Sequence, residues 1–316
     1  MPRNEELIES IKRMKREKNA IILAHYYQVP EIQDLADFIG DSLALSQFAT
    51  KVEQDIIVFC GVHFMAETAK ILNPSKKVLL PDLLAGCSLA DSAPEADFAE
   101  FKSQHPNHKI ITYINSTAAV KALSDVICTS GNALQIVESF PKDQPLIFAP
   151  DKNLGGYINR VTERDMILWQ GSCVVHDQLN TQLIIEQKQK HPDALVIAHP
   201  ECNAPVLQLA DYIGSTNGMI AFAKKSSATR FIVASETGIV HQMQKDAPDK
   251  EFFVVPADES CSCNDCPFMK MNTLEKLYST LLNETPEIVL EDELIQKAYQ
   301  PIRRMLDISI EKGIIK

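Results

Sequence analysis

Residues 195–216 read LVIAHPECNAPVLQLADYIGST. The four apolar residues at the start predict a buried strand. A His-Pro-Glu turn follows, then a predicted helix over residues 204–210, a short strand, and a Ser-Thr pair that opens another helix. The same pattern occurs twice earlier, as IILAHYYQVPEIQDLADFIGDS over residues 21–42 and as IITYINSTAAVKALSDVICTS over residues 110–130. A pattern of this length repeated three times predicts three related units.

Strands and helices alternate after each copy of the pattern, which is typical of parallel sheets joined by right-handed crossovers. We therefore expect an α/β fold with three similar parallel-sheet αβα subdomains related by pseudo-threefold symmetry, and an active site at their central junction. The predicted subdomains span residues 20–104, 105–190 and 191–270. An N-terminal helix within residues 1–19 and C-terminal helices within residues 271–316 are expected to pack on this core.

The three copies place polar side chains at one equivalent position, where the first strand ends. His25, Tyr113 and His199 coincide there, at intervals of 88 and 86 residues. Ligands of parallel sheets bind beyond the carboxyl ends of the strands, and histidine is the usual acid or base near neutral pH. A single residue of this kind is more often packed with one hydrogen bond. The recurrence of such residues at one equivalent position in three units favours a shared site.

Hydroxyl residues recur with the same two intervals, at the start of the next helix in each unit. They are Ser42, Ser130 and Thr216. One interpretation is structural, because Ser and Thr are favoured N-caps. The other is functional, because helix N-termini bind phosphate and carboxylate groups. Three such termini facing one axis would form an anion-binding cavity.

Cysteines also recur, in the loop after the fourth strand of each unit. Cys87 and Cys173 occupy this loop in the first two units, and the third offers Cys261, Cys263 and Cys266. Three thiolates at one point suit an iron–sulfur cluster with one open iron, or a zinc site with an open position. The Cys263–Cys266 pair alone also matches a redox motif or half of a zinc site.

The remaining cysteines, Cys60, Cys128 and Cys202, are expected to be small core residues. His176, near Cys173, has two interpretations: it is a metal ligand, or it packs beside the cysteine or supports it, which is the role we expect. The segment DKNLGGYINR (151–160), with its adjacent glycines, is predicted to be a loop.

The net charge of −11 argues against a general nucleic-acid binder. No apolar run approaches the ~18 residues of a transmembrane helix, and the charged N-terminal segment lacks the apolar core of a signal peptide. We therefore expect no membrane association and a cytoplasmic location.

Together, ten motifs resemble the quinolinate synthase (NadA) family over essentially the whole chain. They are AHYYQ (24–28), GDS (40–42), CSLAD (87–91), TYINS (112–116), CTSGNA (128–133), the segment 169–176, HPEC (199–202), GST (214–216), CPFMKMN (266–272) and PIRRML (301–306). The family fold, three α/β subdomains about a pseudo-threefold axis, agrees with the repeat.

The resemblance implies a 4Fe-4S cluster held by Cys87, Cys173 and Cys266, because the family ligand directly precedes Pro-aromatic-Met. The spacing of Cys261 and Cys263 departs from the CxxCxxC of many bacterial members and leaves their redox role open. The resemblance further implies a transferase of NAD biosynthesis that condenses iminoaspartate (iminosuccinate) with dihydroxyacetone phosphate to quinolinate, releasing phosphate and water, with functional coupling to L-aspartate oxidase.

The resemblance also implies a set of site residues. Substrate contacts are expected from His25, Ser42, Tyr113, Ile114, Asn115, Ser130, His199, Pro200, Glu201 and Thr216. Proton transfer is expected from Tyr27, Tyr113, His199 and Glu201. Two other interpretations of the same residues are a cluster-dependent hydro-lyase acting on a hydroxy acid, and a non-catalytic iron–sulfur or zinc sensor.

Overall fold

The computed structural model describes residues 4–256 and 264–315. Three four-stranded sheets form the core, and the pairings between their strands are parallel. The strand order is the same in each sheet, β2-β1-β3-β4, β6-β5-β7-β8 and β10-β9-β11-β12. This confirms the predicted α/β fold with three similar parallel-sheet units.

The elements of the first unit are β1 (Ala20–His25), α2 (Pro30–Leu35), β2 (Phe38–Gly40), α3 (Ser42–Ala49), β3 (Ile56–Cys60), α4 (His63–Leu72), β4 (Lys77–Leu79), α5 (Ser88–Asp91) and α6 (Glu95–Ser103). Those of the second are β5 (Lys109–Tyr113), α7 (Ala118–Ala122), β6 (Val126–Cys128), α8 (Ala133–Glu138), β7 (Leu146–Ala149), α9 (Lys152–Thr162), β8 (Ile167–Leu168), α10 (Val174–Asp177) and α11 (Thr181–Lys190).

Those of the third are β9 (Leu195–Ala198), α12 (Ala204–Gln208), β10 (Tyr212–Ile213), α13 (Thr216–Lys225), β11 (Arg230–Ala234), α14 (Ile239–Asp246) and β12 (Glu251–Val254). The other elements are α1 (Asn4–Glu17), the 3₁₀ helix η1 (Met269–Met271), α15 (Leu274–Asn283) and α16 (Asp292–Glu311).

One carboxylate contact is repeated in all three units. The residue before the second strand is an aspartate, Asp37, Asp125 or Asp211, and its Oδ2 accepts from a backbone N–H of the first strand, 2.8–2.9 Å away. The backbone N–H of the same aspartate donates to that strand's carbonyl. This double contact explains why the short second strand pairs in one register in every unit.

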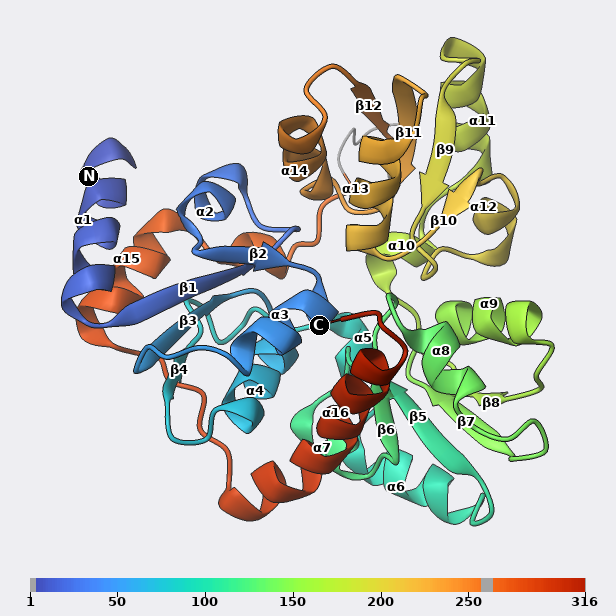
Figure 1. The fold of residues 1–316 in the computed structure, drawn as a ribbon, viewed down its shortest axis with the longest axis horizontal. Coiled ribbons are helices and arrows are strands. Elements are labelled where there is room, and N and C mark those ends of the chain that lie inside the picture. The colour runs from blue at the N-terminus through green and yellow to red at the C-terminus, as the bar shows by residue number, and fades with distance from the viewer. Residues whose placement is uncertain (1–3, 257–263, 316) are drawn as a thin grey trace.

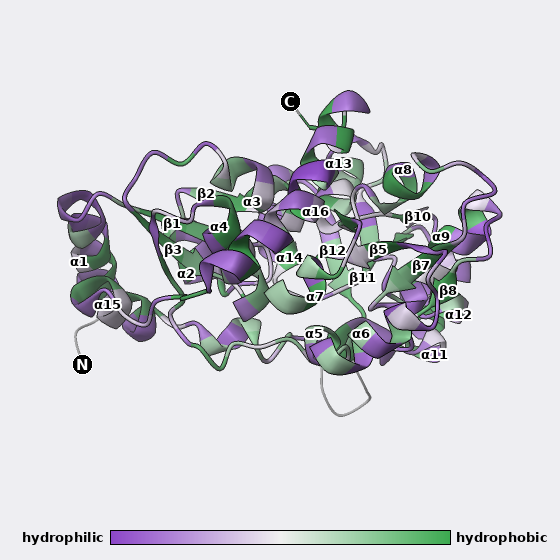
Figure 2. Cartoon of the chain, turned by 90° about the horizontal axis from the view of Figure 1, so that it is seen from below, coloured by the Kyte–Doolittle hydropathy of each residue, from purple (hydrophilic) through white to green (hydrophobic). Residues whose placement is uncertain are grey.

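The three sheets surround a common centre (Figure 1). Their first and third strands, β1 with β3 and β5 with β7, are almost entirely buried, as expected for parallel strands covered on both faces. Figure 2 shows hydrophobic residues on these strands and hydrophilic residues on outer helices such as α16. The strands therefore hold their carboxyl ends rigidly at the centre.

The terminal helices pack on this arrangement. Helices α1 and α15 contact each other beside the first sheet, and α16 packs against α7, β6, α4 and α8. The exact subdomain boundaries stay a prediction. Within the described residues, no helix is both long enough and apolar enough to cross a membrane.

The predicted loop over residues 151–160 is wrong, because residues 152–162 form α9. Asp151 caps this helix by accepting from the backbone N–H groups of Asn153 and Leu154, both at 2.8 Å. A Cβ on Gly155 would lie 2.7 Å from Leu168 and 2.9 Å from Phe148. The glycine therefore allows close packing of helix on sheet instead of making a turn.

Candidate active site

A cavity of about 70 Å³ lies where the strand ends of the three units meet. Nine of the predicted substrate and proton-transfer residues line it: His25, Tyr27, Ser42, Tyr113, Asn115, Ser130, His199, Glu201 and Thr216. Ile114 and Pro200 are buried but do not belong to this lining. The backbone N–H of Ile114 donates to the Cys128 carbonyl at 2.8 Å, and its side chain faces a small apolar hollow beside Leu45.

The three recurring hydroxyls are not helix caps, contrary to the structural interpretation of the sequence. Asp41 caps α3 by accepting from the Ala44 N–H at 3.0 Å, and Ser215 caps α13 by accepting from the Gly218 N–H at 3.1 Å. Helix α8 begins only at Ala133, after Ser130. Neighbouring residues cap α3 and α13, and Ser130 lies before the start of α8, so the three hydroxyl residues Ser42, Ser130 and Thr216 are free to line the cavity.

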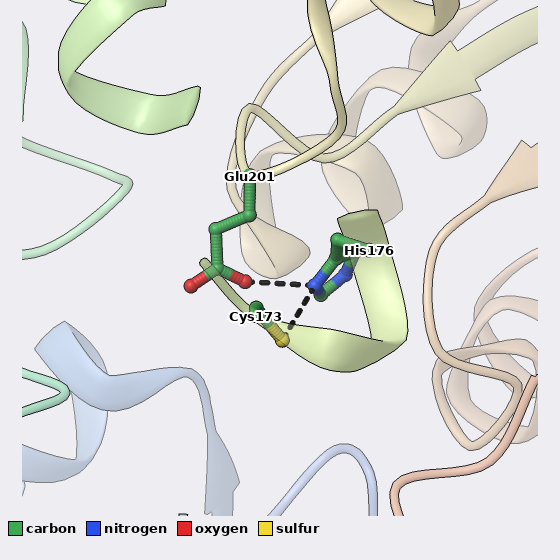
Figure 3. A group of neighbouring side chains, drawn as sticks. All are labelled: Cys173, His176 and Glu201. Carbon is green, nitrogen blue, oxygen red and sulfur yellow. Dashed lines mark hydrogen bonds and ion pairs between the residues drawn. The ribbon is translucent and has the colours of Figure 1, made fainter. Parts of the chain in front are cut away.

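A buried carboxylate, that of Glu201, lies between two imidazoles in the cavity lining; Figure 3 shows it beside one of them, His176. Glu201 Oε2 is 2.8 Å from Nδ1 of His176 and 3.3 Å from Nδ1 of His199. The two imidazole rings stack with their centroids 4.6 Å apart. Burial alone would raise the pKa of Glu201, but His176 and His199 outweigh it and hold that pKa below its usual value. Glu201 is therefore ionised at neutral pH.

The histidine that ends β1 is neutral. Burial lowers the pKa of His25 to about 3, and the neighbouring His199 lowers it as well. Nδ1 of His25 accepts from the Tyr27 backbone N–H at 3.1 Å, so its single proton sits on Nε2. Burial also lowers the pKa of His199. The site thus offers neutral imidazoles beside the carboxylate of Glu201.

A continuous chain of hydrogen bonds joins Glu201 to the opposite wall. Nε2 of His176 is 3.2 Å from Ser235 Oγ, which is 3.2 Å from the Tyr27 hydroxyl. That hydroxyl is in turn 3.0 Å from Thr216 Oγ1. Burial raises the pKa of Tyr27 well above its usual value, so the phenol is protonated and can donate.

The equivalent cysteines of the three units, Cys87, Cys173 and Cys266, line the same cavity as free thiols. Burial raises the pKa of all three, to about 12 for Cys87 and about 11 for Cys266. In the part of the chain that the structure describes, these three sulfurs do not all lie within 4.8 Å of one another. A single zinc ion brings its ligands closer than this. At least two of the sulfurs therefore lie more than 4.8 Å apart, which leaves room between them for a group larger than one metal ion.

The other cysteines either do not line the cavity or lie outside the described residues. Cys60, Cys128 and Cys202 are buried and do not line the cavity, as predicted for core residues. Cys261 and Cys263 lie outside the described residues.

Sequence reasoning missed two residues of the site and one contact of a third. His176 packs beside Cys173 as expected, with Nδ1 3.3 Å from Sγ, but its bond to Glu201 was not predicted. Ser235 and Glu236 follow the third strand of their unit, and Glu236 lines the cavity. Glu236 Oε1 accepts from the Cys266 backbone N–H at 3.1 Å and is 2.8 Å from Nζ of Lys270. Applying the strand-end rule to third strands as well as first strands would have found Ser235 and Glu236.

Comparisons with known proteins agree with this geometry. The family model described as quinolinate synthetase A protein (NadA) matches residues 9–307. The chain is 59% identical over 305 residues to a quinolinate synthase of Microcystis aeruginosa, covering 96% of each chain. It is 56% identical over 305 residues to one of Nostoc punctiforme, covering 96% of this chain and 94% of that relative. The chain therefore belongs to the quinolinate synthase (NadA) family.

Proposed function

We propose that this chain is a quinolinate synthase of NAD biosynthesis, which condenses iminoaspartate with dihydroxyacetone phosphate and releases phosphate and water. The observation that carries the proposal is that three equivalent cysteines line the same cavity as His25, Tyr113 and Glu201. L-aspartate oxidase is the functional partner that we expect to supply the first substrate.

Cys87, Cys173 and Cys266 are the proposed ligands of a 4Fe-4S cluster. Held by three thiolates, such a cluster supplies an iron with a free position, a Lewis acid suited to the loss of hydroxide from a hydroxylated intermediate. Since burial raises the pKa of the three thiols, they are protonated in the cluster-free chain. Binding must therefore displace their protons.

Both substrates are anionic, and the cavity offers neutral donors for them. The hydroxyls of Ser42 and Thr216 stand in the first turns of α3 and α13, where backbone N–H groups and the helix dipole favour phosphate and carboxylate. His25 adds the Nε2 proton. The buried Asn115 Oδ1 finds no partner among the described residues, which supports a contact with substrate. Ile114 and Pro200 are proposed to contribute through their backbone.

Proton transfer is assigned to the two ends of the hydrogen-bonded chain. The ionised Glu201, with His199, is the proposed base that takes protons from the condensing reactants. Tyr27 is the proposed acid, because its phenol stays protonated and lies within hydrogen-bond distance of Ser235 and Thr216. Tyr113 lines the same cavity, and burial raises its pKa too. Holding two small reactants together lowers the entropic part of the barrier.

The decisive experiment is iron and sulfide analysis with an absorption spectrum on protein purified without oxygen, followed by a quinolinate assay. We expect about four irons and four sulfides per chain, and product only when both substrates are present. A cluster without product would contradict the synthase and favour the hydro-lyase. Zinc alone, or no metal, would contradict the cluster.

Ligand variants test the cysteine assignment. Cys87→Ser, Cys173→Ser and Cys266→Ser should each lose the cluster because each removes one thiolate. Cys60→Ala and Cys128→Ala should keep it, because these thiols are buried outside the cavity. Iron per chain is the measurement. Full iron in Cys266→Ser together with loss of iron in Cys263→Ser would overturn the assignment.

A further inference from the structure

A second set of ligand atoms overlaps the proposed cluster site. Sγ of Cys173, Nδ1 of His176 and a carboxylate oxygen of Glu201 all lie within 4.8 Å of one another. Figure 3 shows the three side chains turned toward one point. Nδ1 of His176 is 2.8 Å from Glu201 Oε2 and 3.3 Å from Cys173 Sγ. No other group of this kind occurs among the residues the structure describes.

The donor set and its spacing suit zinc. Zinc binds thiolate at about 2.3 Å and imidazole or carboxylate at about 2.0–2.2 Å in a tetrahedron, so neighbouring ligand atoms lie roughly 3.3–3.8 Å apart. The 3.3 Å between Nδ1 and Sγ falls in this range, and the 2.8 Å between Nδ1 and Oε2 would widen by about 0.5 Å as the metal replaces the hydrogen bond. The side chains of His176 and Glu201 are only 1% and 3% exposed. Because all three residues line the cavity, the fourth position would face it.

Ser235 would orient the imidazole toward such an ion. Its Oγ lies 3.2 Å from Nε2 of His176, and a bonded outer nitrogen is typical of metal-ligating histidines. On zinc binding, the Cys173 thiol loses its proton to solvent. In the metal-free chain, Nδ1 of His176 carries the proton that it donates to the Glu201 carboxylate, 2.8 Å away. On zinc binding the imidazole changes tautomer: this proton moves to Nε2, which donates it to Ser235, and the lone pair of Nδ1 binds the metal. No oxidant or reductant is needed.

We propose that the chain without its cluster binds one Zn²⁺ through Cys173, His176 and Glu201, and that this ion blocks cluster assembly. The block follows because Cys173 cannot ligate the ion and the cluster together. The zinc site itself stands on the geometry of three side chains. The block alone rests on the proposed function, through the assignment of Cys173 as a cluster ligand.

The test uses the full chain, purified without oxygen and freed of iron, with Zn²⁺ alone as the probe. We expect one ion per chain. X-ray absorption at the zinc edge should find one sulfur at about 2.3 Å and two or three nitrogen or oxygen atoms at about 2.0–2.1 Å. Cys173→Ser and His176→Asn should weaken binding by more than about 100-fold, and Ser235→Ala by the 10–100-fold typical of an outer partner.

Matched variants separate the zinc site from the cluster site. Cys87→Ser should lose the cluster and keep zinc, whereas His176→Asn should lose zinc and still assemble the cluster, now insensitive to added Zn²⁺. Three sulfurs around zinc, loss of zinc in Cys87→Ser, or no binding below millimolar zinc would each overturn the proposal. If the wild-type chain binds zinc but never assembles a cluster, the proposed function fails and the zinc site stands.

Discussion

Ser235 connects the proposed acid and the proposed base through hydrogen bonds. Its hydroxyl is the one described link between Nε2 of His176 and the hydroxyl of Tyr27, each 3.2 Å away. A hydroxyl can accept one proton while donating another, so Ser235 lets both neighbours keep a hydrogen bond as the protonation of either one changes.

Ser235→Ala should therefore lower kcat with little change in KM. We expect a fall of about 10–100-fold, smaller than the 10²–10⁴-fold attributed to a full general acid or base, because Tyr27 and Glu201 both remain. Steady-state kinetics normalised to iron content would measure it. Ser139→Ala is the control, because the hydroxyl of this serine donates to the nearby Ile136 carbonyl at 2.7 Å and lies outside the cavity lining. Equal kcat values for Ser235→Ala and wild type would contradict the relay.

The neutral histidines predict how stability depends on pH. Burial lowers the pKa of His25 from 6.5 to about 3, so protons bind the unfolded chain more readily than the folded one. Stability is therefore complete above about pH 6.5 and falls as the pH drops toward 3, by at most about 1.4 kcal/mol per pH unit for this group. Burial lowers the pKa of His199 too, which adds to the slope.

Urea unfolding of the iron-free chain at about pH 7 and about pH 5 measures this dependence. His25→Asn should lose less stability between the two pH values than the wild type, because it removes one of the groups that protonate on unfolding. An identical loss in both proteins would contradict a neutral, buried His25.

At the scale of elements, the segment after β11 holds two parts of the site together. The carboxylate of Glu236 receives the backbone N–H of Cys266 at 3.1 Å and that of Gly238 at 2.7 Å. Lys270 bonds Glu236 and also donates to the Tyr27 carbonyl at 2.8 Å. A proposed cluster ligand and the proposed acid are thus fixed by one buried carboxylate.

Gly238 makes this approach possible. A Cβ there would lie 2.8 Å from Cα of Tyr27 and 2.9 Å from the carbonyl oxygen of Tyr26, and backbone atoms cannot move aside cheaply. Gly238→Ala should lower the free energy of unfolding by about 1–3 kcal/mol and raise KM by displacing the turn that carries Tyr27.

Gly156→Ala is the matched control substitution, and we expect it to raise the free energy of unfolding instead of lowering it. A Cβ at Gly156, inside α9, would meet nothing within 4 Å, and alanine is the better helix former. This variant should gain about 0.5–1 kcal/mol. Urea unfolding of both variants tests the pair. A Gly238→Ala protein as stable as the wild type would show that the Tyr27 turn does not need the close approach.

Sequence patterns predicted these elements unevenly, for physical reasons. The first-strand ends were predictable because parallel strands present their carboxyl ends at one edge and the repeat marked the equivalent residues. The N-caps of α3 and α13 could not be predicted. In each of the pairs Asp41-Ser42 and Ser215-Thr216, both side chains can cap a helix, and the backbone conformation determines which one does. Likewise, the adjacent glycines of α9 predict a loop until the close packing of Gly155 against Phe148 is known.

At the scale of the whole molecule, α16 ties the first two units together. It contacts α4 of the first unit and α7, β6 and α8 of the second. Ile302 and Met305 are fully buried in this contact, and Ser309 Oγ receives the side-chain amide of Asn132 at 2.9 Å. The helix therefore closes one wall between the units, far from the cysteines in sequence.

Met305→Ala should destabilise the whole chain by about 2–5 kcal/mol, through lost burial and the cavity left behind. Ile310→Ala, on the same helix but at a side chain that is 50% exposed, should change stability by less than about 0.5 kcal/mol. Thermal unfolding of the two variants distinguishes them. Equal effects would mean that α16 is not part of the cooperative core.

The equivalent positions of the three units hold different residues, His25, Tyr113 and His199. Three separate copies of one short chain, assembled as a trimer, would have to carry the same residue on every wall of their shared site. Joining the three units in one chain removes that restriction, because the residue at each equivalent position is encoded separately and can change independently. A threefold scaffold can in this way enclose an asymmetric chamber, which is what joining two dissimilar reactants requires.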